Sequence, residues 1–237
     1  MSKKIILKSD DFKYPTEKER YEIQKDWPRL ENFDFKYNHP LALVVNEGVP
    51  MDDASRQSNL FWWDYCLINR IGNLRATYIY TLTNYNRGFS DDLEKCTHIQ
   101  LFNKLLFDYY AEIFYYYFFS TRDIIVQILG NFYSLSTKED KLYFNSEFIN
   151  KLNNISVRNA ILSFEASTKD AYKYRNEFAH RYTPNIVDYR TVISDDKLKM
   201  SFGGGGFITS VKIVENINDS LNTLSKFILE LKEFVKD

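Results

Sequence analysis

The chain has 237 residues, of which 44% are hydrophobic and 27% are charged, and its formal net charge at pH 7 is −1. A chain of this length can bury a substantial core, as one largish domain or as one domain with an appendage. The balanced charge argues against a protein that coats DNA, because such proteins carry an excess of Lys and Arg. It leaves room for a small basic site inside a cleft.

Cysteine use and hydropathy favour a cytoplasmic protein. Cys66 and Cys96 do not have the spacing of metal ligands, and we expect two reduced thiols. The apolar run within residues 1–8 is too short for a signal peptide. The most apolar stretch, residues 101–135, is interrupted by charged side chains, and it therefore predicts a long core helix rather than a membrane span.

Residues 1–50 have the composition of an irregular N-terminal extension. They hold four of the chain's five prolines, and one short helix is expected at about 17–25. Aromatic side chains are expected to anchor this extension to the rest of the chain. They are Trp27, Phe33, Phe35 and Tyr37.

Past the extension, apolar residues recur at helical spacing. The first helix is expected at 52–85, followed by a turn at 86–89. Ser90 has the hydroxyl of a helix N-cap, and Asp91 and Asp92 suit the positive end of a helix dipole. The next helix is therefore expected to begin there and to run for about 40 residues. Two long helices joined by a short turn should pack antiparallel.

The second half of the chain predicts two further helices and a hairpin. The helices are expected at 138–151 and 156–182, and Pro184 ends the second because it has no N–H to donate. The pattern then changes to the alternation of strands at 189–193 and 198–202, which predicts a small β-hairpin. A last helix follows and runs almost to the C-terminus.

The sequence as a whole predicts an all-α fold. Residues 1–50 form the extension, and residues 51–237 form an antiparallel helical bundle with the β-hairpin before its C-terminal helix. The glycine run 203–206 favours a flexible hinge. The alternative, a loop that cradles phosphate, lacks the Lys-Ser or Lys-Thr that such loops require.

The candidate site lies late in the 156–182 helix, where Arg175, Asn176 and His180 occur within two turns. Arg175 falls in the apolar stripe of this helix, so its guanidinium must find a partner. Asn176 and His180 share a face, whereas Arg175 and His180 diverge by about 140°. The long Arg side chain, a loosened last turn or a second subunit can each close that gap. Alternatively, both cations only complement the negative end of the helix dipole.

This Arg-Asn-x-x-x-His pattern resembles the Arg-x4–6-His signature of the HEPN superfamily (higher eukaryotes and prokaryotes nucleotide-binding domains), in which a polar residue, often Asn, follows the Arg. The aromatic-then-acidic segment 115–123 is similar to the long preceding helix of that family. The resemblance covers about residues 52–235. The N-terminal extension and the hairpin depart from a minimal HEPN core, which leaves the subfamily open.

The resemblance implies a metal-independent endoribonuclease that acts on RNA as a homodimer. His180 would move the proton of the 2′-OH or of the leaving 5′-oxygen, because imidazole titrates near neutrality. Arg175 would stabilise the transition state and Asn176 would orient the phosphate. We expect neither a metal nor a cofactor. Many members of the superfamily are toxins or phage-defence proteins, so an antitoxin protein is an expected partner.

Three further residues are weaker candidates for substrate binding. Arg181 and Tyr182 follow the motif and would contact the RNA backbone or stack on a base, although Tyr182 also suits the core. Asp123 would pair with Arg175, or else remain a solvated surface charge.

Two competing interpretations of the whole chain stay open. It is either a non-catalytic HEPN-like module that binds RNA, nucleotide or protein, or a helical scaffold in which Arg175 and His180 are structural.

Overall fold

The computed structural model describes residues 8, 11–135, 142–180, 183–185, 191–195, 199–202 and 207–235. The chain packs as two compact units, each assembled from three separate stretches. Unit 1 comprises Met1–Trp27, Thr77–Tyr115 and Asp170–Asp219. Unit 2 comprises Pro28–Ala76, Tyr116–Lys169 and Ser220–Asp237.

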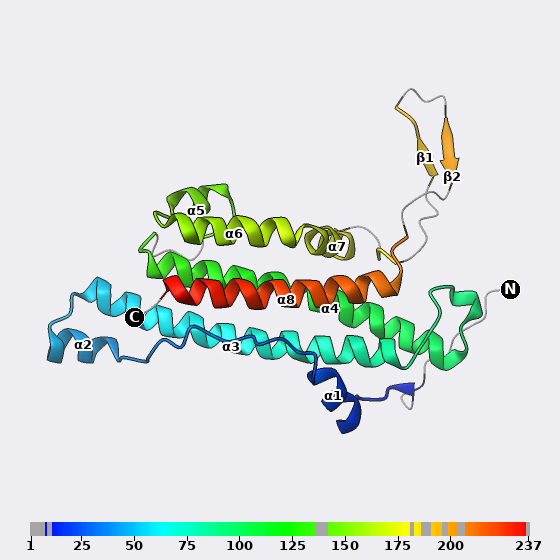
Figure 1. The fold of residues 1–237 in the computed structure, drawn as a ribbon, viewed down its shortest axis with the longest axis horizontal. Helices are drawn as coiled ribbons and strands as arrows, with labels where there is room; N and C mark the ends of the chain where they lie inside the picture. The colour runs from blue at the N-terminus through cyan, green and yellow to red at the C-terminus, as the bar shows by residue number, and fades with distance from the viewer. Residues whose placement is uncertain are drawn as a thin grey trace. The chain divides into compact units, whose positions relative to one another are not determined.

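Helices dominate the described residues (Figure 1). In chain order they are α1 (Glu17–Gln24), α2 (Pro40–Glu47), α3 (Met51–Asn86), the 3-10 helix η2 (Leu93–Lys95), α4 (His98–Phe132), α5 (Ser146–Lys151), α6 (Ile155–Ser167), α7 (Lys169–His180) and α8 (Ser210–Phe234). The strands β1 (Thr191–Ile193) and β2 (Met200–Phe202) pair antiparallel, with Thr191 opposite Phe202. None of the described helices has the length and apolar character needed to cross a membrane.

The N-terminal region contains two helices where the sequence predicted one. α1 begins with a capping box, in which Thr16 and Glu19 each bind the other's backbone N–H. α2 was missed, although Pro40 stands in its first turn and Gly48 ends it with φ 67°, a conformation that glycine adopts without strain.

The predicted start of the second long helix at Ser90 is wrong, because α4 begins at His98. A capping box fixes this start, since the Thr97 hydroxyl accepts from the Gln100 N–H and the Gln100 side chain accepts from the Thr97 N–H. The acids after Ser90 do lie at helix starts, but not at that of α4. Asp92 accepts from the Glu94 N–H in η2, and Asp91 binds the N–H (3.0 Å) and hydroxyl of Ser210, where α8 begins.

The predicted 156–182 helix is divided into α6 and α7 at Thr168. Thr168 has φ −105° and ψ 14°, and its N–H and hydroxyl both bind the carbonyl of Phe164, at 3.0 and 2.8 Å. Residues 181–182, with which the predicted helix ended, lie outside the described residues.

The helix predicted from residue 138 begins later, at Ser146. The side chain of Asn145 caps α5 by accepting from the N–H of Phe148, and residues 142–145 are not helical. Residues 138–141 and the glycine run 203–206 lie outside the described part of the chain.

In unit 1, ring contacts show the relative direction of the long helices α3 and α4. Tyr80 lies against Tyr110 with 4.6 Å between ring centroids, and Tyr85 lies 5.9 Å from Phe107. Residue numbers rise along α3 as they fall along α4, so these segments run antiparallel, as predicted. α8 joins them through the Tyr78 hydroxyl, which donates to the side-chain carbonyl of Asn218 at 3.0 Å.

In unit 2, a stack of buried phenylalanines joins three helices. Phe164 of α6 lies between Phe118 of α4 and Phe227 of α8, with centroids 6.0 and 4.4 Å away. All three side chains are almost fully buried, and each such burial contributes about 1.5–3 kcal/mol.

The buried carboxylate of Asp64 holds the extension to α3 within unit 2. It accepts from the backbone N–H groups of Phe33, Asp34 and Phe35, at 2.7–3.1 Å, and from the side-chain amide of Asn32 at 2.7 Å. Asp34 has φ 69°. This conformation lets three successive N–H groups point toward the same carboxylate, an arrangement known as an anion-binding nest. The predicted aromatic anchors are also in contact, since Phe35 lies 6.4 Å from Phe132 and Tyr37 lies 5.0 Å from Phe61.

Candidate functional site

The candidate motif occupies the last two turns of α7, in unit 1 (Figure 1). α7 starts immediately after the break at Thr168, and Asp170 in its first turn suits the positive end of the helix dipole. Ala171 is fully buried, so one face of α7 is packed against the unit and the opposite face is open to solvent.

A buried tyrosine of α4 anchors α7. The Tyr115 ring stacks on Phe178, with centroids 5.9 Å apart, and meets Tyr174 edge-on at 6.0 Å. Its hydroxyl donates to the side-chain carbonyl of Asn216 in α8 at 2.8 Å. Burial raises the pKa of Tyr115 well above its ordinary value of 10.0, and Tyr174 adds to the rise, so the hydroxyl remains a neutral donor. These contacts fix the rotation of α7 and thereby the directions in which Arg175 and Asn176 leave the helix.

Arg175 and Asn176 are brought together. Both side chains are half-buried, and Nη1 of Arg175 donates to Oδ1 of Asn176 at 3.0 Å. The sequence predicted that Arg175 would need a partner, and a neutral amide fills that role. The amide restrains the guanidinium without cancelling its charge.

No ion pair joins Arg175 to a carboxylate of the described residues, Asp123 included. Asp123 belongs to unit 2, is largely exposed, and accepts from Nη2 and Nε of Arg122 at 2.7 and 3.0 Å. Arg122 itself packs over the rings of Phe119 and Phe144. The charge of Asp123 therefore already has a partner, whereas the charge of Arg175 is left for an anion.

His180 is the last residue of α7, five positions after Arg175. Its backbone continues the helix, so the two Cα–Cβ directions differ by the angle expected for an α-helix, about 140°. Arg181 and Tyr182 lie outside the described residues.

A charged cluster that the sequence analysis did not single out holds the chain just after the motif. Nζ of Lys104 lies 2.6 Å from both carboxylate oxygens of Asp108, and the side-chain amide of Asn185 donates to the same carboxylate. Lys104 is almost fully buried. Burial raises the pKa of Asp108 above its ordinary value of 3.8, while Lys104 opposes the rise.

A backbone hydrogen bond also joins the two ends of the segment that carries β1 and β2. The N–H of Ile208 donates to the carbonyl of Pro184 at 2.9 Å, next to Asn185. The chain that leaves α7 is thus tied both to α4 and to the residues preceding α8. A sequence signal for the cluster existed, because Lys104 and Asp108 are two opposite charges four residues apart within a mostly apolar part of α4.

The described residues contain no group of three or more His, Cys, Asp or Glu side chains arranged to hold a metal ion. The motif itself offers the guanidinium of Arg175 and the amide of Asn176, and its last residue, His180, has an imidazole. A guanidinium and an amide can bind an anion, and an imidazole can exchange a proton.

Comparison with known proteins supports the resemblance that the motif indicated. Residues 63–237 match a family model described as HEPN_Cthe2314-like HEPN. The search of curated proteins and the search of solved structures returned no match. The family match spans well over half of the chain and includes the motif, and the helical architecture agrees with it. The chain therefore belongs to the HEPN superfamily.

Proposed function

We propose that this protein is a metal-independent endoribonuclease of the HEPN type, with Arg175, Asn176 and His180 as its catalytic residues. Membership of the superfamily supports an RNase-type or nucleotide-binding function. The observation that carries the finer proposal is the Arg175–Asn176 hydrogen bond, because it holds a half-buried guanidinium in place while leaving its charge uncompensated. A structural arginine at such a position would instead be expected to pair with a carboxylate.

The proposed reaction uses the nucleophile that RNA carries. The 2′-OH attacks the adjacent phosphorus, the P–O5′ bond breaks, and the products are a 2′,3′-cyclic phosphate and a 5′-hydroxyl. His180 accepts the 2′-OH proton or donates a proton to the departing 5′-oxygen. Arg175 donates to the phosphoryl oxygens, whose negative charge grows in the transition state, and Asn176 keeps it oriented.

The angle between Arg175 and His180 favours a site assembled by two copies of the chain. Side chains that leave one straight helix about 140° apart do not converge readily on one phosphate. If two α7 helices met across a twofold axis, Arg175 of one copy and His180 of the other would face the same groove. We therefore propose a homodimer as the active species, with Arg181 and Tyr182 contacting the RNA around the groove.

The direct test is cleavage of a single-stranded RNA of mixed sequence in EDTA. We expect cleavage by the wild-type chain and a loss of about 100-fold or more in His180→Ala, the range for removal of a general acid or base. An RNA with a 2′-deoxy residue at the cleaved position should be resistant. Lys173→Ala removes an exposed cation from the same helix and should cleave normally.

Two results would contradict the proposal. One is cleavage that persists unchanged in His180→Ala. The other is RNA binding without cleavage by a well-folded wild-type chain, which would instead support a non-catalytic RNA-binding module.

We further propose a biological role as a cytoplasmic toxin or phage-defence nuclease restrained by a cognate antitoxin protein, as is common in the superfamily. Expression of the wild-type chain should then arrest bacterial growth, and Arg175→Ala should relieve the arrest at equal protein levels. Growth arrest that is the same for both chains would argue against this role.

A further inference from the structure

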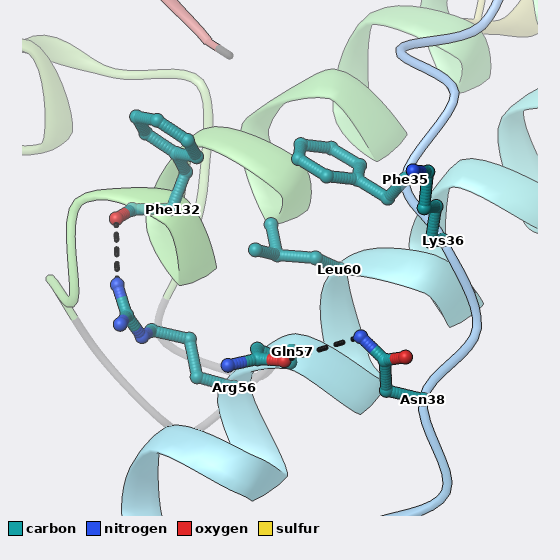
Figure 2. A pocket seen from close by; sticks show the side chains of 7 residues that line it. All are labelled: Phe35, Lys36, Asn38, Arg56, Gln57, Leu60 and Phe132. Atoms are coloured by element: carbon teal, nitrogen blue, oxygen red, sulfur yellow. Dashed lines mark hydrogen bonds between the residues drawn. The ribbon is translucent and has the colours of Figure 1, made fainter. Parts of the chain in front are cut away.

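A pocket in unit 2 gathers polar and aromatic side chains without using any motif residue. It has a volume of about 400 Å³, and Figure 2 shows the seven residues that line it. They come from the extension (Phe35, Lys36, Asn38), from α3 (Arg56, Gln57, Leu60) and from the end of α4 (Phe132). All but Phe132 precede residue 63, where the family match begins, so the match does not account for this pocket.

The pocket carries positive charge that the chain does not fully compensate. Nη2 of Arg56 lies 3.0 Å from the carboxylate of Asp53, and Nη1 reaches the Phe132 carbonyl only at 3.5 Å. Nε of Arg56 is shut off from solvent and has no hydrogen-bond partner among the described residues. Lys36 is exposed and forms no ion pair with any described side chain. Two cations against one carboxylate favour an anionic ligand.

The remaining walls suit a flat ring with hydrogen-bonding edges. Phe35 and Phe132 lie 6.4 Å apart between centroids and tilt by 40°, and with Leu60 they provide an apolar surface. Asn38 donates to the carbonyl of Gln57 at 3.4 Å, which leaves the Gln57 amide donors and the Asn38 carbonyl for a ligand (Figure 2). A paired donor and acceptor of this kind matches the edge of a nucleobase.

We propose that this pocket binds a nucleoside monophosphate, with its phosphate at Arg56 and Lys36 and its base against Phe132 and the two amides. The volume lies within the range of small-molecule sites, and it far exceeds the needs of a lone phosphate. Because the pocket joins the extension to α3 and α4 within unit 2, the bound nucleotide stabilises that part of the fold.

Isothermal titration calorimetry of the full chain with adenosine 5′-monophosphate tests the proposal. We expect a Kd of about 10–100 µM at low ionic strength, and clearly weaker binding of adenosine and of inorganic phosphate. Lys36→Gln should weaken binding about tenfold, since it removes one charge-assisted contact. Gln57→Glu keeps the shape but places a carboxylate beside Arg56, and it should abolish binding.

A control variant separates this pocket from other cations of the chain. Lys226→Gln removes an exposed lysine of α8 in the same unit and should not change the Kd. If the monophosphate does not bind at about 1 mM, or if Gln57→Glu binds it as wild type does, the proposal is wrong and Arg56 serves only the end of α4. Inorganic phosphate that binds as tightly as the nucleotide would overturn the assignment of the base.

Discussion

At the scale of single residues, the partner of Arg175 decides what the motif can do. A carboxylate partner would have stabilised the guanidinium and also neutralised it, whereas Asn176 only orients it. Arg122 differs from Arg175 in its partners, which are the carboxylate of Asp123 and two aromatic rings. The charge of Arg122 is thus paired with a carboxylate, whereas the charge of Arg175 remains available for a phosphate.

A pair of substitutions at Asn176 tests this difference. Asn176→Ala frees the Arg175 side chain and should lower kcat/KM for RNA cleavage about tenfold through lost orientation. Asn176→Asp keeps an acceptor at the same place but pairs the guanidinium with a charge, so the loss should be larger and should include a raised KM. Thermal unfolding of both variants provides the control for folding. Equal activity of the Asp variant and wild type would contradict the role assigned to the amide.

A second residue-scale prediction concerns Asp64. Asp64→Ala leaves three backbone N–H groups and the Asn32 amide without their acceptor, and should lower the free energy of unfolding by about 3 kcal/mol or more. The matched control is Asp123→Ala, which removes an exposed carboxylate and should change stability by about 0.5 kcal/mol or less. Urea unfolding at neutral pH measures both values. A loss at Asp64 no greater than at Asp123 would refute the anchoring role.

At the scale of elements, Arg87 at the end of α3 binds the start of α1 within unit 1. Arg87 contacts both carboxylate oxygens of Glu19, at 2.8 and 3.0 Å, and also donates to the carbonyls of Lys13 and Tyr14. Its five N–H donors thus bind four backbone or side-chain oxygens of the N-terminal region. The attachment of α1 thus has a polar part beside the buried side chain of Ile23, and this polar part should respond to pH.

The expected pH dependence follows from Glu19. The hydrogen bonds from Arg87, opposed by burial, lower the pKa of Glu19 from its ordinary value of 4.5 to about 2. The ionised carboxylate therefore stabilises the folded chain above pH 4.5, and this contribution is lost as the pH falls toward 2. We expect Glu19→Gln to cost about 1–2 kcal/mol at pH 7, because partial exposure screens the pair, and much less at pH 3. Urea unfolding at the two pH values tests this; an equal cost at both would contradict it.

At the scale of the whole molecule, the proposed homodimer can be tested by mixing two inactive variants. Equal amounts of Arg175→Ala and His180→Ala, each inactive alone, should exchange subunits when mixed. If each groove uses Arg175 of one copy and His180 of the other, half of the dimers regain one intact site and activity returns to about a quarter of the wild-type value. Cleavage of labelled RNA and the mass of the mixture by light scattering measure the result. A dimeric mixture without activity would place both groups in the same chain.

Much of the fold was open to prediction because it rests on local patterns. The three-and-four spacing of apolar residues predicted α3 within one residue at each end. The antiparallel packing of α3 and α4 followed from their length and the short connection. The start of α4 was missed although Thr97 with Gln100 caps it in the same way that Thr16 with Glu19 caps α1, whose start was predicted. The pair Thr97 and Gln100 was overlooked because Ser90, followed by two acidic residues, has an equally good sequence for a helix N-cap.

The sequence by itself indicated the superfamily and the helical class, because a six-residue signature and a 3.6-residue period are both local properties of the chain, and the role of the motif residues stays a prediction. Only the tertiary structure decided that Asn176 binds Arg175, that Asp123 binds Arg122, and that Asp91 serves α8 rather than α4. Each of these choices involves side chains whose alternative partners are equally allowed by charge and spacing. Packing selects among them, because a donor can bind only the acceptors that the fold brings within hydrogen-bond distance.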